Sequence, residues 1–175
     1  MSLTPRQPVP AISLPLVGGG RWSLPDAAPE AFTLALFYRG QHCPICRTQL
    51  QDFQAHLDGF AKKGARVVAI STDGAERAAE SKRDWGLDRL DIAYGLSVEE
   101  ARAWGLFIST HRGRTSLGVE EPALFNEPGL FLIRPDNTLY ASYVQSAPFT
   151  RPKAEEVLKA IGFVQEKDYP ARGEA

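Results

Sequence analysis

Short apolar segments and longer amphipathic segments alternate along this chain. Residues 32–38 (FTLALFY) and 66–71 (RVVAIS) are nearly continuous apolar runs, as in strands buried on both faces of a sheet. Between them one apolar face recurs every three or four residues, and its members are Cys46, Leu50, Phe53, Leu57 and Phe60. With Pro44 in its first turn and Gly64 after its last, this stretch predicts a helix over 44–63, which makes the two strands parallel.

The second half of the chain predicts further helices and strands. Two pairs of polar residues have the spacing of a capping box ahead of a helix, Asp73 with Glu76 and Ser97 with Glu100. Residues 91–94 fit a short strand between these helices, and 129–134 with 139–145 fit an antiparallel hairpin. A last helix is predicted over 153–161, ended by Gly162.

Two regions do not follow the helical pattern. Residues 1–30 are rich in Pro and Gly around two short apolar patches, which predicts a small β-hairpin ahead of the main fold. Residues 107–127 show no clear period, and a loop of that length inside a compact domain is usually functional. We therefore expect a single domain over 1–175, of class α/β, with a central mixed β-sheet flanked by helices and 1–30 as an N-terminal extension.

Composition excludes several classes of partner. The hydrophobic content of 43% and charged content of 23% are ordinary for a globular protein, and the formal net charge is −1. Such a charge gives no overall field to attract nucleic acid or an anionic membrane. No run reaches the roughly 18 apolar residues of a membrane span, and the first twenty residues lack a signal-peptide core. We expect a cytoplasmic protein with neither nucleic acid nor membrane as a partner.

The only two cysteines, Cys43 and Cys46, are the strongest candidates for chemistry. A disulfide between them would close too short a loop to stabilise the fold appreciably. Cys43 falls at the start of the predicted helix, at the carboxyl end of a central strand, where the helix dipole favours an anion. Its pKa should therefore fall from about 8.5. The pattern predicts an exposed thiolate at Cys43 and a shielded Cys46 that resolves mixed disulfides.

A zinc site is the main alternative for the cysteine pair. A structural zinc needs four ligands, and beyond the cysteines the chain offers only three histidines, His42, His56 and His111. His56 lies about three turns along the same predicted helix, too far to join Cys43. We therefore predict no metal and no cofactor. His42 is interpreted as tuning the charge of the neighbouring thiol, with simple contact to solvent as the alternative.

The segment FYRGQHCPICRTQL at 37–50 closely resembles the active-site stretch of peroxiredoxin-like proteins of the alkyl hydroperoxide reductase/thiol-specific antioxidant family. The stretches VVAISTD, WGL, EEPALFNEPGLFLIRPDNTLY and DYPARGE extend this resemblance over nearly the whole chain. It implies a thioredoxin-like fold and an antioxidant oxidoreductase that acts on peroxide or disulfide. It also implies a dithiol electron donor, such as a thioredoxin-like protein, or a low-molecular-weight thiol, and it leaves a homodimer open.

The predicted active site departs from the peroxiredoxin pattern at three positions. Arg39 stands in the place of that family's proline and Cys43 in the place of its threonine, which puts Cys46 at the peroxidatic position. The arginine with which the family activates peroxide is matched by Pro128. The combination of Cys43, Cys46 and Pro128 is instead similar to thioredoxin, which implies a cis Glu127–Pro128 bond whose backbone pairs with substrate.

These observations leave three functions open. The leading interpretation is a thiol–disulfide oxidoreductase in which Cys43 attacks and Cys46 resolves. The first alternative is a thiol peroxidase with Cys46 peroxidatic and Cys43 resolving. The second is a non-enzymatic, redox-responsive binding module that uses the loop at 107–127. The residues expected to support the site or bind substrate are Arg39, His42, Pro44, Glu127 and Pro128.

Overall fold

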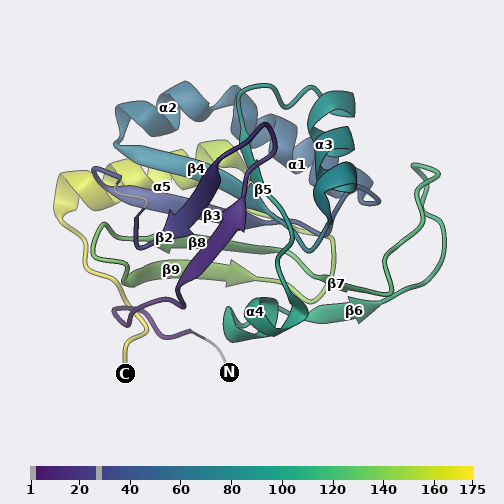
Figure 1. The fold of residues 1–175 in the computed structure, drawn as a ribbon. Helices are drawn as coiled ribbons and strands as arrows, with labels where there is room; N and C mark the ends of the chain where they lie inside the picture. Colours follow the sequence, from purple (N-terminus) through teal and green to yellow (C-terminus); the bar gives the residue numbers. More distant parts are fainter. Residues whose placement is uncertain (1–2, 27–28) are drawn as a thin grey trace.

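A five-stranded mixed sheet with the strand order β5-β4-β3-β8-β9 forms the centre of the fold (Figure 1). The computed structural model describes residues 3–26 and 29–175, so residues 1–2 and 27–28 of the predicted extension lie outside it. The strands are β3 (Phe32–Phe37), β4 (Ala65–Ile70), β5 (Asp91–Ala93), β8 (Gly129–Ile133) and β9 (Leu139–Val144). β3 runs parallel to β4 and antiparallel to β8, which confirms the predicted class and the predicted hairpin.

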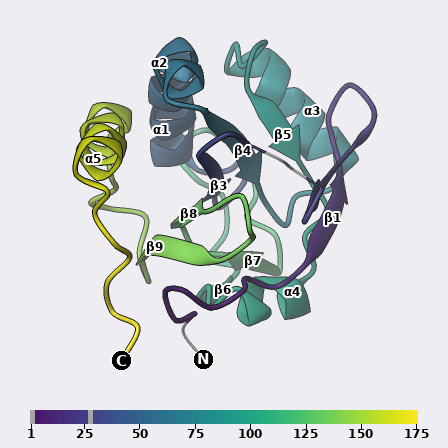
Figure 2. The same ribbon diagram turned by 90° about the vertical axis from the view of Figure 1, so that its left-hand side faces the viewer.

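Helices cover the face of the sheet that carries the cysteines. They are α1 (Pro44–Ala55), α2 (Leu57–Lys62), α3 (Ala75–Asp84) and α5 (Ala154–Lys167). Leu34 and Leu36 of β3 are buried in one cluster with Leu50 of α1, Phe60 of α2 and Ile161 of α5. Figure 2 shows α1, α2 and α5 grouped on this side. This packing fixes the start of α1 against the end of β3.

The opposite face of the sheet is covered by α4 (Val98–Ala103) and by the hairpin of β1 (Ile12–Pro15) and β2 (Arg21–Leu24). Successive residues of a strand point to opposite faces. Phe37 of β3 therefore packs with Ile12, Leu14 and Trp104 rather than with α1. The predicted N-terminal hairpin and the capping box of Ser97 with Glu100 are both confirmed.

The single helix predicted over 44–63 is wrong, because the chain breaks at His56. The backbone N–H of His56 bonds to the carbonyl of Phe53 at 3.1 Å instead of that of Asp52. The imidazole Nδ1 of His56 lies 2.8 Å from the Asp52 carbonyl oxygen, which the helix would otherwise have used. α1 therefore ends at Ala55, and α2 begins at Leu57 as a separate short helix.

Two further expectations need correction. The region 107–127 holds a short antiparallel pair, β6 (Ile108–Thr110) with β7 (Leu124–Asn126), rather than loop alone. The last helix runs past Gly162 to Lys167, where Asp168 adopts a left-handed conformation. The helix continues through Gly162, where a Cβ would meet only the flexible end of the Lys63 side chain, so this glycine does not end the helix.

No helix within residues 3–26 and 29–175 has the length and apolar character needed to cross a membrane.

Candidate active site

The turn between β3 and α1 places the two cysteines. Tyr38 continues the pairing of β3 with β4 through its N–H to the carbonyl of Ile70, and the chain then turns at Gly40, whose φ is +129°. The N–H of Cys43 donates to the Gly40 carbonyl at 3.1 Å, and Cys43 is the N-cap of α1. Pro44 occupies the first turn, where its missing N–H costs nothing, as predicted.

The Cys43 sulfur is the anionic member of the pair. It accepts the backbone N–H of Cys46 at 3.2 Å, and the Arg151 guanidinium lies 3.6 Å away. A hydrogen bond from the Cys46 thiol, with smaller effects of Arg151 and Arg39, lowers the pKa of Cys43 to about 6 against the opposing effect of burial. The predicted fall in pKa is confirmed. The predicted exposure is wrong, because Cys43 is fully buried under Arg151.

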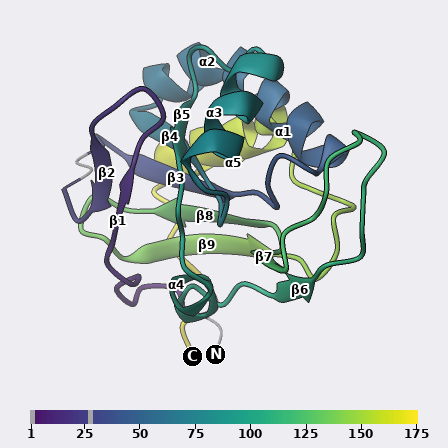
Figure 3. The same ribbon diagram turned by 45° about the vertical axis from the view of Figure 1, so that its right-hand side comes forward.

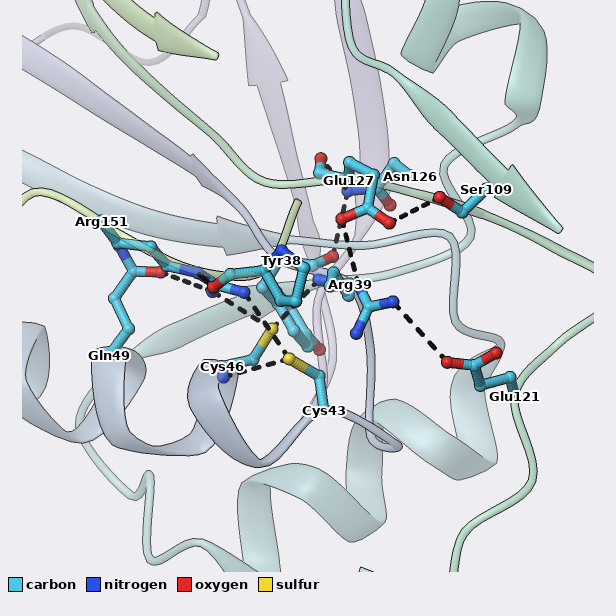
Figure 4. A network of polar contacts seen from close by, with 11 residues as sticks. Tyr38, Arg39, Cys43, Cys46, Gln49, Ser109, Glu121, Asn126, Glu127 and Arg151 are labelled. Carbon is cyan, nitrogen blue, oxygen red and sulfur yellow. Dashed lines mark hydrogen bonds and ion pairs between the residues drawn. The ribbon is translucent and has the colours of Figure 1, made fainter. Parts of the chain in front are cut away.

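The Cys46 sulfur is a neutral thiol beside the same charged side chain, Arg151. Burial, and the hydrogen bond that it donates to Cys43, raise the pKa of Cys46 well above its ordinary value. Its sulfur accepts the backbone N–H of Arg39 at 3.3 Å and Nη1 of Arg151 at 3.2 Å (Figure 4). The two cysteines form no disulfide in this structure, so the site holds one sulfur of lowered pKa and one of raised pKa.

Arg151 is the functional candidate that sequence reasoning missed. It follows β9 in the connection to α5, more than 100 residues from the cysteines, yet its guanidinium contacts both sulfurs. Its Nε donates to the Pro148 carbonyl at 2.8 Å, and its Nη1 donates to Gln49 Oε1 at 2.8 Å. These bonds hold the positive charge over the thiols. No local spacing in the sequence signals this contact.

Arg39 and Glu127, which were predicted separately as supporting residues, form an ion pair beside the thiols. Arg39 Nε lies 3.1 Å from Glu127 Oε2, and Nη2 lies 3.6 Å from Glu121 Oε1. Glu127 also accepts the hydroxyl of Ser109 at 2.6 Å, and the guanidinium stacks over the ring of Phe125 at 4.8 Å. The Arg39 side chain is thus fixed next to Cys43 by groups from β6 and β7.

His42 is buried and neutral. Burial, aided by Arg39 and Arg77, lowers the pKa of His42 to about 3, and its ring packs against Phe125 with centroids 4.6 Å apart. Neither predicted role fits as stated. The side chain does not contact solvent, and an uncharged imidazole adds no positive charge next to Cys43.

The Glu127–Pro128 bond is not cis, contrary to the expectation; the cis bond among the described residues is Leu24–Pro25. The backbone on both sides of Pro128 is already paired. Glu127 N–H donates to the Phe107 carbonyl at 2.8 Å, and Gln145 N–H donates to the Pro128 carbonyl at 3.0 Å. An incoming chain therefore finds no free backbone at Pro128, and the thioredoxin-like substrate platform is absent from this part of the described fold.

Asp73 was predicted to cap α3, but its carboxylate turns toward the active-site turn instead. The N-cap of α3 is Gly74, and Asp73 Oδ2 accepts the N–H of Gln41 at 2.7 Å. Burial raises the pKa of Asp73 to about 6 from 3.8. A carboxyl group whose pKa is higher in the folded protein than in the unfolded chain lowers the free energy of unfolding as the pH rises from 3.8 to about 6.

Asp73→Asn should therefore remove a pH-dependent penalty. The free energy of unfolding of the wild type, relative to Asp73→Asn, is expected to fall by about 3 kcal/mol between pH 3.5 and pH 7.5. Asn keeps an oxygen for the Gln41 N–H, so the turn should remain intact. Urea denaturation of both proteins across this range measures the difference. If the free energy of unfolding changes with pH in the same way in both proteins, folding does not raise the pKa of Asp73.

Gly40 cannot carry a side chain without disturbing the turn. A Cβ there would lie 2.7 Å from Asp73 Oδ1, and the φ of +129° is unfavourable for other residues. We expect Gly40→Ala to destabilise the reduced protein by about 2–4 kcal/mol. Gly74→Ala is the control, because nothing lies within 4 Å of a Cβ at Gly74. Equal midpoints of urea denaturation for the two variants would contradict this expectation.

A dithiol pair at the start of a helix, directly after the central strand of a mixed sheet, defines a thiol-redox protein with the thioredoxin-like fold. Residues 5–142 match the AhpC/TSA family, and the chain belongs to that family. It is accordingly a peroxiredoxin-like, thiol-dependent oxidoreductase of the antioxidant class. No curated protein shows significant sequence similarity to the chain.

Solved peroxiredoxin structures share the fold at low sequence identity. A cysteine-to-serine mutant of peroxiredoxin 6 of Arenicola marina is 20% identical, with a TM-score of 0.75 over 95% of this chain and 76% of that one. AhpC of Enterococcus faecalis is 18% identical, with a TM-score of 0.73 over 98% of this chain and 99% of that one. Peroxidoxin BcpB of Mycobacterium tuberculosis is 21% identical, with a TM-score of 0.70 over 94% and 97%.

Proposed function

We propose that this protein is a thiol peroxidase in which Cys43 is oxidised by a hydroperoxide and Cys46 then forms a disulfide with it. The observation that carries this assignment is the difference in charge between the two sulfurs. The hydrogen bond from the Cys46 thiol, aided by Arg151 and the Cys46 N–H, favours the thiolate at Cys43, whereas Cys46 is a buried thiol. A thiolate is the nucleophile in such reactions, so the contacts favour Cys43 over Cys46 for the first attack.

The first step oxidises Cys43 by two electrons. Its thiolate attacks the hydroxyl oxygen of the hydroperoxide and the O–O bond breaks. The attacked oxygen keeps its proton as the sulfenic acid, and the other oxygen leaves and takes a proton from water to give alcohol or water. The resulting sulfenic acid stands next to Cys46. Loss of the Cys46 proton lets that sulfur attack Cys43, and the hydroxyl leaves as water. Two donor thiols, or one dithiol, then reduce the disulfide.

The closure of the site favours a small oxidant. Both sulfurs have 0% exposure, and Arg151 and Arg39 lie on either side of them. A peroxide needs only a narrow opening, whereas a protein disulfide must bring its own backbone against the sulfur that it exchanges with. The paired backbone around Pro128 offers no such docking edge.

Four predicted residues support the pair in this proposal. Arg39 binds Cys46 through its backbone and places its charge near Cys43, while Glu127 fixes the Arg39 side chain. Pro44 starts α1 next to Cys43, and His42 is a neutral, buried ring that packs against Phe125. Arg151 joins this set as the group that covers both sulfurs.

Thiol–disulfide exchange is the second candidate function. It is favoured by the thiolate at the N-cap of α1 with a protonated partner one turn later, which is the arrangement that exchange requires. Ile45 between the cysteines is 36% exposed and could contact a partner protein once Arg151 moves.

Stopped-flow mixing of the reduced protein with hydrogen peroxide tests the proposal. We expect thiol loss orders of magnitude faster than that of a free thiolate at the same pH, followed by a disulfide detected by mass. The Cys43→Ser/Cys46→Ser double variant gives the background. A peroxide rate no higher than that of a free thiolate, with rapid reduction of a protein disulfide, would replace the peroxidase by the second candidate.

A further inference from the structure

Cys46 must lose a proton at the step that forms the disulfide. In the reduced pair its thiol donates a hydrogen bond to the Cys43 sulfur, but that sulfur is no longer an anion once it is a sulfenic acid. Cys46 is fully buried, and the groups that contact its sulfur, the Arg151 guanidinium and the Arg39 N–H, can only donate. The acceptor is therefore either the departing hydroxyl or a further buried group.

Several buried polar atoms around the active-site turn have no hydrogen-bond partner within residues 3–26 and 29–175. They include the Tyr38 hydroxyl, both ring nitrogens of His42 and Oδ1 of Asp73. A buried polar atom without a partner costs free energy, so each such atom in a folded protein calls for an explanation. A group of them beside a redox pair is a candidate route for a proton.

The Asp73 carboxylate has the properties of the missing base. It is 2% exposed, and it lies so close to the turn that a Cβ on Gly40 would be 2.7 Å from Oδ1. Oδ2 accepts the N–H of Gln41, which leaves Oδ1 able to take a proton. Burial raises the pKa of Asp73 to about 6, against the opposing effects of the Gln41 N–H and Arg77. The group is therefore ionised at neutral pH and a stronger base than an ordinary carboxylate.

The Tyr38 side chain connects this carboxylate to the cysteines. It is fully buried in one cluster with Cys43 and Cys46, and Figure 4 shows its ring directed toward the two sulfurs. Burial, with the negative charges of Asp73 and Cys46, raises the pKa of Tyr38, so its hydroxyl stays protonated. A hydroxyl both accepts and donates, which is what a group that passes on a proton requires.

The other titratable and charged groups around Asp73 do not fit the role of base. Burial and two neighbouring arginines lower the pKa of His42 to about 3, so its ring binds a proton far more weakly. Two residues of α3 face the same turn, and Figure 3 shows this helix beside α1. Arg77 is a cation and can only donate, while Glu80 accepts the side-chain amide of Gln41.

We propose that Asp73 takes the proton of the Cys46 thiol, passed on by the Tyr38 hydroxyl, when Cys46 attacks Cys43. The inference rests on the proposed peroxidase cycle. In this step the Cys46 S–H bond breaks, the bond between the two sulfurs forms, and the S–O bond of the sulfenic acid breaks. The hydroxide that departs takes a proton from the Asp73 carboxyl through solvent and leaves as water, so Asp73 is again a carboxylate.

The first experiment follows the two oxidised forms by acid quench and mass spectrometry after mixing with hydrogen peroxide. Asp73→Asn keeps an oxygen for the Gln41 N–H, but conversion of its sulfenic acid to the disulfide at pH 7.5 should be slower by about tenfold or more. Tyr38→Phe should slow the same step. Thr33→Val removes another unpaired, buried hydroxyl from β3 and should not. An unchanged rate in Asp73→Asn would overturn the relay and assign the proton to the departing hydroxyl.

The pH dependence of disulfide formation separates a base from a structural support. The wild-type rate, divided by that of Asp73→Asn, should rise with pH up to about 6 and then level off, because only the ionised carboxyl accepts a proton. A ratio that is the same at every pH would mean that Asp73 supports the turn and does not act as a base.

The second experiment needs no peroxide. Cys43 attacks the disulfide of the reagent dithiobis(nitrobenzoate) and releases one coloured thiolate, and the attack of Cys46 on the mixed disulfide releases the second. We expect the second release to be slowed in Asp73→Asn as in the peroxide reaction. A second release at the wild-type rate would overturn the relay. A slowed release, together with a peroxide rate no higher than that of a free thiolate, would keep the relay and remove the proposed peroxidase.

Discussion

Replacing Cys43 with serine is expected to slow the reaction with hydrogen peroxide at pH 7 by a factor of about 100 or more. The remaining thiol, Cys46, is buried, and burial is the largest of the effects that raise its pKa, so it stays mainly protonated at neutral pH. Serine is close in size to cysteine, and the N-cap bond to Cys46 N–H is retained by its hydroxyl. Stopped-flow measurement of the second-order rate gives the loss directly.

Cys46→Ser is the matched variant for this experiment. Cys43 should still be oxidised, because the serine hydroxyl can replace the Cys46 thiol as the hydrogen-bond donor that contributes most to the low pKa of Cys43. No disulfide can form, so the sulfenic acid at Cys43 should accumulate and react with dimedone. Dimedone labelling of Cys46 in the Cys43→Ser protein, at an undiminished rate, would reverse the two roles and favour the peroxidatic position implied by the family resemblance.

Arg151→Met is expected to lower the peroxide rate about tenfold near pH 5, with the difference disappearing above pH 9. The guanidinium lowers the pKa of Cys43, and its loss moves the ionisation of that thiol to higher pH. A pKa change of one unit alters the thiolate fraction tenfold on the acid side of the titration. At high pH the thiol is ionised in both proteins, so the charge no longer matters to the population of thiolate.

Two further variants separate charge from packing at this position. Arg151→Lys keeps a positive charge but cannot reach both sulfurs with two N–H groups, so its profile should lie between those of wild type and Arg151→Met. Arg47→Met removes an exposed arginine from α1 and should leave the profile unchanged. A uniform loss of rate at every pH in Arg151→Met would mean that Arg151 acts on access or folding, not on ionisation.

Local signals in the sequence were sufficient for most of the architecture. The strand at 32–37, the Pro44 start of α1 and the Ser97 capping box each depend on residues within a few positions of one another. The N-cap placement of Cys43 follows from the same local pattern, and with it the direction of its pKa shift. Propensity and periodicity carry this kind of information well.

The contacts that complete the site could not be read from such patterns. β9 forms one edge of the sheet, and the segment that follows it passes over α1. Arg151 contacts the sulfurs because it lies in that segment. Asn126 joins β7 to the active-site turn through the Tyr38 carbonyl at 3.0 Å, again across the sheet. The burial of Cys43 and the trans bond at Pro128 have the same cause, since tertiary pairing decides both.

Because Cys43 is completely buried under Arg151, the motion that uncovers its sulfur can be measured. At pH 8 this thiol is almost fully ionised, so its intrinsic reactivity toward iodoacetamide is that of a free thiolate of the same pKa. Alkylation of the folded protein can proceed only while the sulfur is uncovered, and the ratio of the two rates is the fraction of time spent open. A thousandfold reduction would correspond to an opening free energy of about 4 kcal/mol. The alkylation rate therefore sets an upper limit on the rate at which Cys43 can react with any oxidant that is too large to enter the closed site.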